Sequence, residues 1–277
     1  MNDIYFKVNE NFEPIIKNCL KDKEIKNMKL ITTGWTNIVY EVETNDGNYF
    51  FRFPRDEFWS RTIVKDCEFS QYIYQKTDFN TCRLKLQYDN ERPFSMHKKI
   101  LGVPLAEKMD KLSEYEIKAI SDDIAKFMAE LHALDFKKED IFSINNIGLN
   151  LRDFLDELLT KHVSKEDRAF WRFTDTIDKP QCLVHGDLNL SNILLDENNK
   201  ITAIIDFGFA GFGNKYDDIA RVLSRDCPEV FKKAITESYE NYSKNKIDEK
   251  TLNDKITEWS NIDKGYINYM RGIGIYE

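Results

Sequence analysis

The amino-acid sequence predicts a two-lobed α+β fold, with a small antiparallel β-rich lobe before a larger, mostly helical lobe. The first part of the chain contains short β-branched and aromatic runs, separated by turn residues, with one helical pattern among them. After Gly102, apolar residues recur at helical spacing, and a single strand-rich insert, residues 182–207, interrupts that pattern. We therefore expect an N-terminal lobe at residues 1–100 and a C-terminal lobe at residues 101–277.

The elements of the first lobe follow from local patterns. A helix is expected near the N-terminus, where Phe12, Ile15 and Ile16 recur at helical spacing. Asn45-Asp46-Gly47 is a tight-turn sequence that joins two strands as a hairpin. The sequence predicts strands over residues 28–32, 38–42, 49–53, 83–88 and 93–100, with one helix over residues 61–75. These strands would form a small antiparallel sheet.

Helical patterns dominate the second lobe. The clearest covers residues 112–134, where Ser113 and Glu116 have the spacing of a capping box. Further helices are expected over residues 151–163, 165–177, 217–223, 228–242 and 249–259. The strand-rich insert differs from these segments, and polar insertions of this kind often carry functional loops.

Composition and charge disfavour several classes of protein. The formal charge is −8, from 40 basic and 48 acidic residues, whereas nucleic-acid binders usually carry the opposite sign. No apolar run approaches the ~18 residues of a membrane span, and the N-terminus lacks the pattern of a signal peptide. We therefore expect a cytoplasmic protein, monomeric by default, with no nucleic-acid or membrane partner. The acidic excess either attracts a cationic substrate or only keeps the protein soluble.

The insert carries the residue types that phosphoryl transfer requires. It contains His185-Gly186-Asp187, then Asn192 five positions after the aspartate, and Asp206-Phe207-Gly208 after two apolar runs. A carboxylate can orient an acceptor hydroxyl and accept its proton, and Mg²⁺ prefers carboxylate and amide oxygens. The spacing matches the catalytic loop and metal-binding aspartate of protein kinases. A β-hairpin with solvated aspartates is the alternative interpretation.

The same block resembles the signature of the aminoglycoside phosphotransferase and choline kinase superfamily, because it contains His-Gly-Asp rather than His-Arg-Asp. Residues 216–221, Tyr-Asp-Asp-Ile-Ala-Arg, are similar to a helix start of that family. Residues 128–134, Met-Ala-Glu-Leu-His-Ala-Leu, are similar to one of its helix ends. The resemblance extends from about Met28 to about Tyr269.

This resemblance implies a protein-kinase-like fold and a role for each motif residue. Asp187 would be the catalytic base, or the aspartate that orients the acceptor hydroxyl. Asn192 and Asp206 would bind Mg²⁺. His185 would brace the catalytic loop, and Asp218 would hold its backbone amides.

The resemblance also implies a nucleotide site in the first lobe. Kinases use a glycine-containing loop, a strand lysine and a helix glutamate there. The candidates here are Gly34, Arg52 in place of the lysine, and Glu68, with which Arg52 would form an ion pair. Arginine and lysine are not interchangeable, so Arg52 would alter nucleotide preference or rate. Backbone groups near Lys99 and Ile100 are expected to meet the purine.

Two short segments, residues 51–55 and 98–105, resemble the 2''-acting aminoglycoside phosphotransferases. That subgroup often favours guanine nucleotides, so the resemblance implies either ATP or GTP as co-substrate. It also implies a small, cationic, aminoglycoside-like acceptor. The candidate residues of the acceptor pocket are Asn189, Phe209, Phe212, Glu229, Glu237, Glu258 and Trp259.

Three alternatives remain at this point. A housekeeping kinase of choline, ethanolamine or an amino sugar would share the signature, because fold does not fix substrate. A protein kinase is disfavoured by the lack of an Ala-Pro-Glu segment and by the short stretch after Asp206. A catalytically silent nucleotide-binding module has only Arg52 in its favour.

Overall fold

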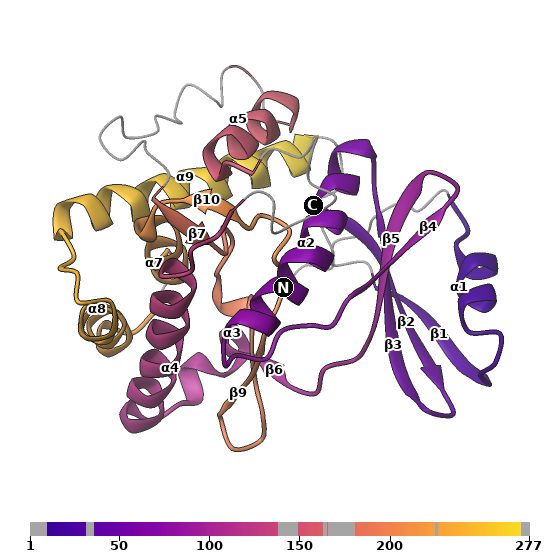
Figure 1. Cartoon of the computed structure of the whole chain (residues 1–277), viewed down its shortest axis with the longest axis horizontal. Coiled ribbons are helices and arrows are strands. Elements are labelled where there is room, and N and C mark those ends of the chain that lie inside the picture. The colour runs from indigo at the N-terminus through magenta and orange to yellow at the C-terminus, as the bar shows by residue number, and fades with distance from the viewer. Residues whose placement is uncertain are drawn as a thin grey trace.

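The computed structural model describes residues 10–31, 36–137, 149–162, 165, 181–224 and 227–272. A β-sheet with a short helix forms one end of the molecule, and most of the helices form the other end (Figure 1). A long helix, α2 (Glu57–Lys76), runs between these two parts (Figure 1). This arrangement confirms the predicted two-lobed α+β class.

An antiparallel sheet of five strands forms the first lobe, in the order β1-β2-β3-β5-β4. The strands are β1 (Ile25–Ile31), β2 (Asn37–Thr44), β3 (Gly47–Pro54), β4 (Lys85–Asp89) and β5 (Arg92–Lys98). All five predicted strands are therefore present. The predicted turn joins β2 to β3, and Gly47 has a φ of 125°, which glycine adopts without steric cost.

One face of the sheet is covered by helix α1 (Glu13–Cys19). Phe12 and Ile16 are buried in the apolar cluster of this lobe, and the Phe12 ring stacks on Phe53 with 4.1 Å between centroids. Burial of an aromatic side chain stabilises the fold by roughly 1.5–3 kcal/mol. The helix therefore holds β3, and with it Arg52, in place.

Helix α2 begins four residues before the start expected from its apolar spacing, at Glu57 rather than Arg61. The Asp56 side chain accepts a hydrogen bond from the Trp59 amide at 3.1 Å and so caps the helix. The first turn buries Phe58 and Trp59 in the large core cluster of the helical lobe. Helix α2 therefore ties the two lobes together.

The helical lobe follows a short strand, β6 (Val103–Pro104). Its helices are α3 (Leu105–Lys108), η1 (Met109–Lys111), α4 (Glu114–His132), α5 (Leu151–His162), α7 (Lys215–Leu223), α8 (Glu229–Ser243) and α9 (Glu249–Gly272). Ser113 and Glu116 form the predicted capping box of α4. The helix expected over residues 165–177 lies, except for residue 165, outside the described residues. None of the helices described here is long and apolar enough to cross a membrane.

The strand-rich insert forms β7 (Cys182–Val184), the 3-10 turn η4 (Leu190–Asn192), β8 (Ile193–Leu195) and β9 (Ile201–Ile204). A further strand, β10 (Gly211–Gly213), pairs with β7. The sequence did not predict β10, because two of its three residues are glycines, which are rare in strands. His185 follows β7 and Ile205 follows β9, and the His185 Nε2 atom lies 3.1 Å from the Ile205 carbonyl oxygen. The polar segments after these two strands therefore meet.

Candidate active site

A cavity of about 660 Å³ lies between the two lobes. Arg52 on β3 lines it from the sheet. Asp187, Asn192 and Asp206 line it from the insert, and Trp259 lines it from α9. Candidate residues that are far apart in the sequence thus line the same cavity, as kinase chemistry requires.

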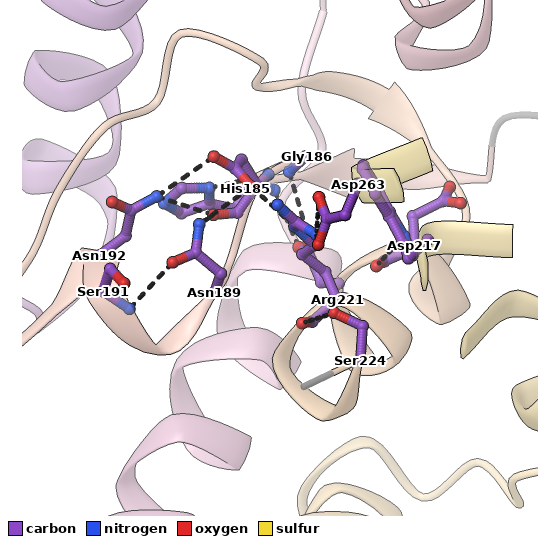
Figure 2. Close-up of polar contacts among 12 residues, drawn as sticks. His185, Gly186, Asn189, Ser191, Asn192, Asp217, Arg221, Ser224 and Asp263 are labelled. Carbon is purple, nitrogen blue, oxygen red and sulfur yellow. Dashed lines mark hydrogen bonds and ion pairs between the residues drawn. The ribbon is translucent and has the colours of Figure 1, made fainter. Parts of the chain in front are cut away.

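The Asp187 carboxylate is held on both of its oxygens. Its Oδ1 atom accepts hydrogen bonds from Arg221 Nε at 2.7 Å and from Asn189 Nδ2 at 3.0 Å. The Asn192 amide donates to the Asp187 carbonyl at 2.9 Å and to Oδ2 at 3.4 Å. Figure 2 shows these contacts converging on the loop between β7 and η4. The side chain is 23% exposed, so an acceptor molecule in the cavity can reach it.

The loop that carries Asp187 is braced from below by Asp218. The Asp218 carboxylate is fully buried and accepts hydrogen bonds from the amides of His185 at 2.8 Å and Gly186 at 2.9 Å. Burial by itself would raise the pKa of Asp218, but hydrogen bonds from His132 and the loop hold it below the ordinary value. The carboxylate therefore stays ionised and keeps both amides bound.

Gly186 is required by its surroundings. Its φ is +80°, and a Cβ atom at this position would lie 2.4 Å from the carbonyl oxygen of Phe209. Any other residue would displace the Asp-Phe-Gly segment. The glycine of the His-Gly-Asp motif thus allows the two functional loops to pack directly together.

Asn192 and Asp206 lie side by side, because the Ile205 amide donates to the Asn192 carbonyl at 3.0 Å. The Asp206 backbone is in the left-handed region, with φ at 68°, and its carboxylate is 42% exposed. The Asn192 amide nitrogen binds Asp187, which leaves the Oδ1 atom as a potential ligand. One carboxylate and one amide oxygen fit Mg²⁺, which commonly takes its other ligands from phosphates and water. Within the described ranges, no group of three or more His, Cys, Asp or Glu could hold a metal ion by itself.

Arg52 bridges two aspartates at the nucleotide end of the cavity. Its NH1 atom forms an ion pair with Asp66, and NH2 lies 3.2 Å from Asp206 Oδ1. Although burial alone would lower the pKa of Arg52, the carboxylates of Asp66 and Asp206 raise it, so the guanidinium stays charged.

The expected ion pair between Arg52 and Glu68 was wrong, because Asp66 takes that position. Two residues along a helix correspond to a rotation of about 200°, so the two carboxylates face different directions. Asp66 Oδ1 also accepts hydrogen bonds from Ser70 Oγ at 3.1 Å and from the Phe207 amide at 2.8 Å. The aspartate therefore links helix α2 directly to the Asp-Phe-Gly segment.

The other nucleotide candidates lie at the sheet and the connection between lobes. Lys99 and Ile100 line the cavity, and Lys99 Nζ also pairs with Glu41 Oε1 at 2.7 Å. Gly34 lies outside the described residues, but Asn37, at the end of the same loop, lines the cavity. The buried Oδ1 atom of Asn37 makes no hydrogen bond within the described chain.

The acceptor end of the cavity differs from the prediction. Asn189 and Trp259 line it, but Glu229 and Glu258 do not. Glu229 is exposed as the first residue of α8, and Glu258 pairs with Lys255 at 3.0 Å. Their expected place in the acceptor pocket was therefore wrong, because the phase of each helix directs these acids elsewhere.

Two charged residues of the site were not singled out from the sequence. Arg221 is the last residue of the Tyr-Asp-Asp-Ile-Ala-Arg segment, so the motif contained it without indicating its contact with Asp187. Asp263 lines the cavity from α9, and its position four residues after Trp259 was the only available indication. Phe209 lines the cavity as predicted, but the rest of the apolar wall was not predicted; it includes Trp59, Leu158, Leu159 and Ile262.

The overall fold is similar to that of several solved structures. Among solved structures, the GDP and kanamycin complex of APH(2")-IIia is 22% identical, with a TM-score of 0.70 over 95% of this chain and 92% of that one. ADP-bound aminoglycoside phosphotransferase APH(2'')-Ib is 20% identical, with a TM-score of 0.64, and the match covers 95% of this chain and 92% of that one. The macrolide 2'-phosphotransferase MphH from Brachybacterium faecium is 15% identical, with a TM-score of 0.64, and the match covers 95% of this chain and 94% of that one. These matches share the fold of this chain.

The sequence itself matches a family model over most of its length. The model describes a phosphotransferase enzyme family and covers residues 27–247, which include most of the sheet, the strand-rich insert and helix α8. The chain belongs to this phosphotransferase enzyme family.

Proposed function

We propose that this protein is a small-molecule kinase that transfers the γ-phosphate of ATP or GTP to a hydroxyl group with Mg²⁺. One observation carries the proposal: Asp187, Asn192, Asp206 and Arg52 line a single cavity between the lobes. That set provides a carboxylate for the acceptor, oxygen ligands for a metal and a cation for phosphate.

The residues divide the chemistry between them. Asp187 orients the acceptor hydroxyl and accepts its proton as the phosphoryl group arrives, while Asn189 and Arg221 fix the carboxylate. Asn192 and Asp206 would hold Mg²⁺ through oxygen atoms, and the bound ion would neutralise charge on the phosphates. Arg52 binds phosphate oxygens through its planar fork, which requires the guanidinium to turn away from Asp206.

We further propose a cationic, aminoglycoside-like acceptor. The protein carries a charge of −8, the carboxylates of Asp187 and Asp263 face the cavity, and several neighbours in fold were solved with aminoglycosides. A less polar hydroxylated acceptor is a second candidate, because Leu158, Leu159 and Ile262 give the wall an apolar part and the macrolide 2'-phosphotransferases share the fold. Choline, ethanolamine and amino sugars remain alternatives within the same reaction.

The test is Mg²⁺-dependent release of nucleoside diphosphate from ATP and from GTP, supplied separately. The panel contains kanamycin, gentamicin, a macrolide, choline, ethanolamine and glucosamine, with Asp187→Asn as the control. We expect one acceptor class to stimulate release in the wild type and not in the variant. Equal release by the wild type and by Asp187→Asn, with every acceptor, would refute a kinase that works through Asp187.

A further inference from the structure

Helix α9 contacts helix α7 through residues spaced four apart on one face. Lys255, Trp259 and Asp263 occupy three successive turns of α9, so their side chains point the same way. Asp217 and Arg221, also four apart, face them from α7. The two helices therefore meet through a ladder of polar contacts rather than through apolar packing alone.

Each rung of this ladder is a defined contact. Lys255 Nζ lies 3.1 Å from Asp217 Oδ1. Trp259 Nε1 donates to the Asp217 carbonyl at 3.0 Å, and its ring centre lies 4.7 Å from the Arg221 guanidinium. Asp263 receives Arg221 NH1 on both oxygens, at 3.0 and 2.9 Å, and Figure 2 shows these two side chains facing each other. Two successive turns of α9, at Trp259 and Asp263, thus contact one arginine.

Arg221 joins this ladder to the proposed catalytic aspartate. Its Nε atom donates to Asp187, while its NH1 atom donates to Asp263. The guanidinium is only 8% exposed, so water screens it little. Burial alone would lower the pKa of Arg221, but Asp187 and Asp263 raise it and keep it charged. One positive charge is therefore shared by two carboxylates, and the trio carries a net charge of −1.

We propose that Asp263 is a positioning residue for phosphotransfer, which acts through Arg221 to orient Asp187. Without Asp263, the guanidinium would lose the two hydrogen bonds that hold it from α9 and would be free to shift. The Asp187 carboxylate, which Arg221 Nε binds, would shift with it, away from the acceptor hydroxyl. Lys255 supports this arrangement by setting the register of α9 on α7. This inference rests on the proposed role of Asp187.

The first experiment compares Asp263→Asn with Asp254→Asn, an exposed acid on the same helix. Turnover is measured as diphosphate release from MgATP and MgGTP, with water and with kanamycin as acceptors. We expect Asp263→Asn to lower kcat about 10- to 100-fold, because misplacement of a catalytic group has effects of that size. The KM for nucleotide should change less than about twofold, and Asp254→Asn should behave as the wild type.

A double-mutant cycle separates positioning from a general loss of structure. In an Arg221→Met background, Asp263→Asn should lower kcat little further, because its effect passes through Arg221. Additive losses, or an unchanged kcat in Asp263→Asn, would overturn the inference. Asp263→Glu keeps the negative charge and serves as the test if Asp263→Asn proves unstable. This variant should retain most of the wild-type turnover. A kcat for Asp263→Glu as low as that of Asp263→Asn would also contradict the proposal.

The two proposals fail in different ways. If Asp187→Asn keeps wild-type turnover, the kinase mechanism through Asp187 fails, and the role of Asp263 fails with it. If Asp187→Asn loses turnover but Asp263→Asn does not, only the positioning role is refuted.

Discussion

Two arginines, Arg52 on β3 and Arg221 on α7, line the same cavity, and each lies between two aspartates. Arg52 joins Asp66 on α2 to Asp206, whereas Arg221 joins Asp263 on α9 to Asp187. In both clusters one aspartate belongs to the catalytic insert and the other to a helix outside it.

The clusters differ in how tightly the functional aspartate is held. Asp206 is 42% exposed and lies 3.2 Å from its arginine, while Asp187 is 23% exposed at 2.7 Å. In the proposed mechanism, Asp206 would have to be free to meet a metal and phosphates, whereas Asp187 would need a constant orientation. On that mechanism we expect the Arg52 contact to be exchanged for ligand and the Arg221 contact to persist during turnover.

The largest effect should follow from Asp187→Asn. The amide cannot accept the hydroxyl proton, so we expect kcat to fall roughly 1,000-fold, while the melting temperature stays close to the wild-type value. Steady-state diphosphate release and thermal unfolding measure the two quantities. A variant that retains a tenth or more of the wild-type kcat would contradict the assignment of Asp187.

Asp206→Ala should weaken Mg²⁺-dependent nucleotide binding about 100-fold, because it removes the only carboxylate proposed as a metal ligand. Calorimetric titration with MgATP and MgGTP measures the dissociation constant. Glu197→Ala, an exposed acid on the same hairpin, is the matched control. Binding that keeps its full Mg²⁺ dependence in Asp206→Ala would show that the metal lies elsewhere.

Replacement of each arginine by lysine compares the two clusters directly. A lysine offers one compact charge in place of a planar fork, so it cannot bridge two carboxylates in the same way. We expect Arg52→Lys to raise the nucleotide KM about 10-fold. Arg221→Lys should instead lower kcat about 10-fold and leave the nucleotide KM within about twofold.

The same kinetic change in both variants would remove the distinction between an exchanged contact and a persistent one. The melting temperatures of Arg52→Lys and Arg221→Lys serve as the control. The kinetics of the two variants can be compared only if both stay folded under the assay conditions.

A third cation, Lys65, is fully buried, and we expect its replacement to have the smallest effect of these variants. Its Nζ atom has no hydrogen-bond partner within the described residues and lies 4.8 Å from the centre of the Phe154 ring. Burial, with a smaller effect from Arg61, lowers the pKa of Lys65 to about 7. Unlike the two arginines, this cation has no carboxylate partner among the residues that the structure describes.

The sign of the pH effect follows from this lowered pKa. Between about pH 7 and the ordinary lysine pKa of 10.5, the unfolded chain binds more protons than the folded one, so stability rises with pH. Below about pH 7, Lys65 is protonated in both the folded and the unfolded state, so its unfavourable contribution to the free energy of folding no longer changes with pH. Lys65→Met should therefore raise the free energy of unfolding at pH 7 by roughly 2–4 kcal/mol.

Urea denaturation at pH 7 and pH 9 measures this effect. The gain from Lys65→Met should shrink by roughly 2 kcal/mol at the higher pH. Arg61→Met, which removes a neighbouring charge, is the comparison variant. A gain that is equal at both pH values would show that Lys65 is protonated in the folded protein throughout this range.

The amino-acid sequence by itself determined the local elements and the central motif. The hairpin at Gly47 and the capping box at Ser113 depend on residues within three or four positions of each other, and such short-range interactions can be read from the chain. The sequence spacing of Asp187, Asn192 and Asp206 also predicted correctly that these residues lie together. Asn192 precedes and Asp206 follows a single hairpin, whose two strands pair with each other.

Only the tertiary structure decided which charges meet. Asp66 rather than Glu68 pairs with Arg52, Asp263 reaches Arg221, and Glu229 lies away from the cavity. Each outcome depends on the rotational phase of a helix, and one residue changes that phase by about 100°. Phase is set by contacts with elements far away in the chain, such as the hydrogen bond that Asp66 of α2 accepts from the Phe207 amide. The spacing of apolar residues in the sequence identifies the buried face of a helix. Which side chains of other elements that face contacts is decided only when the elements pack together.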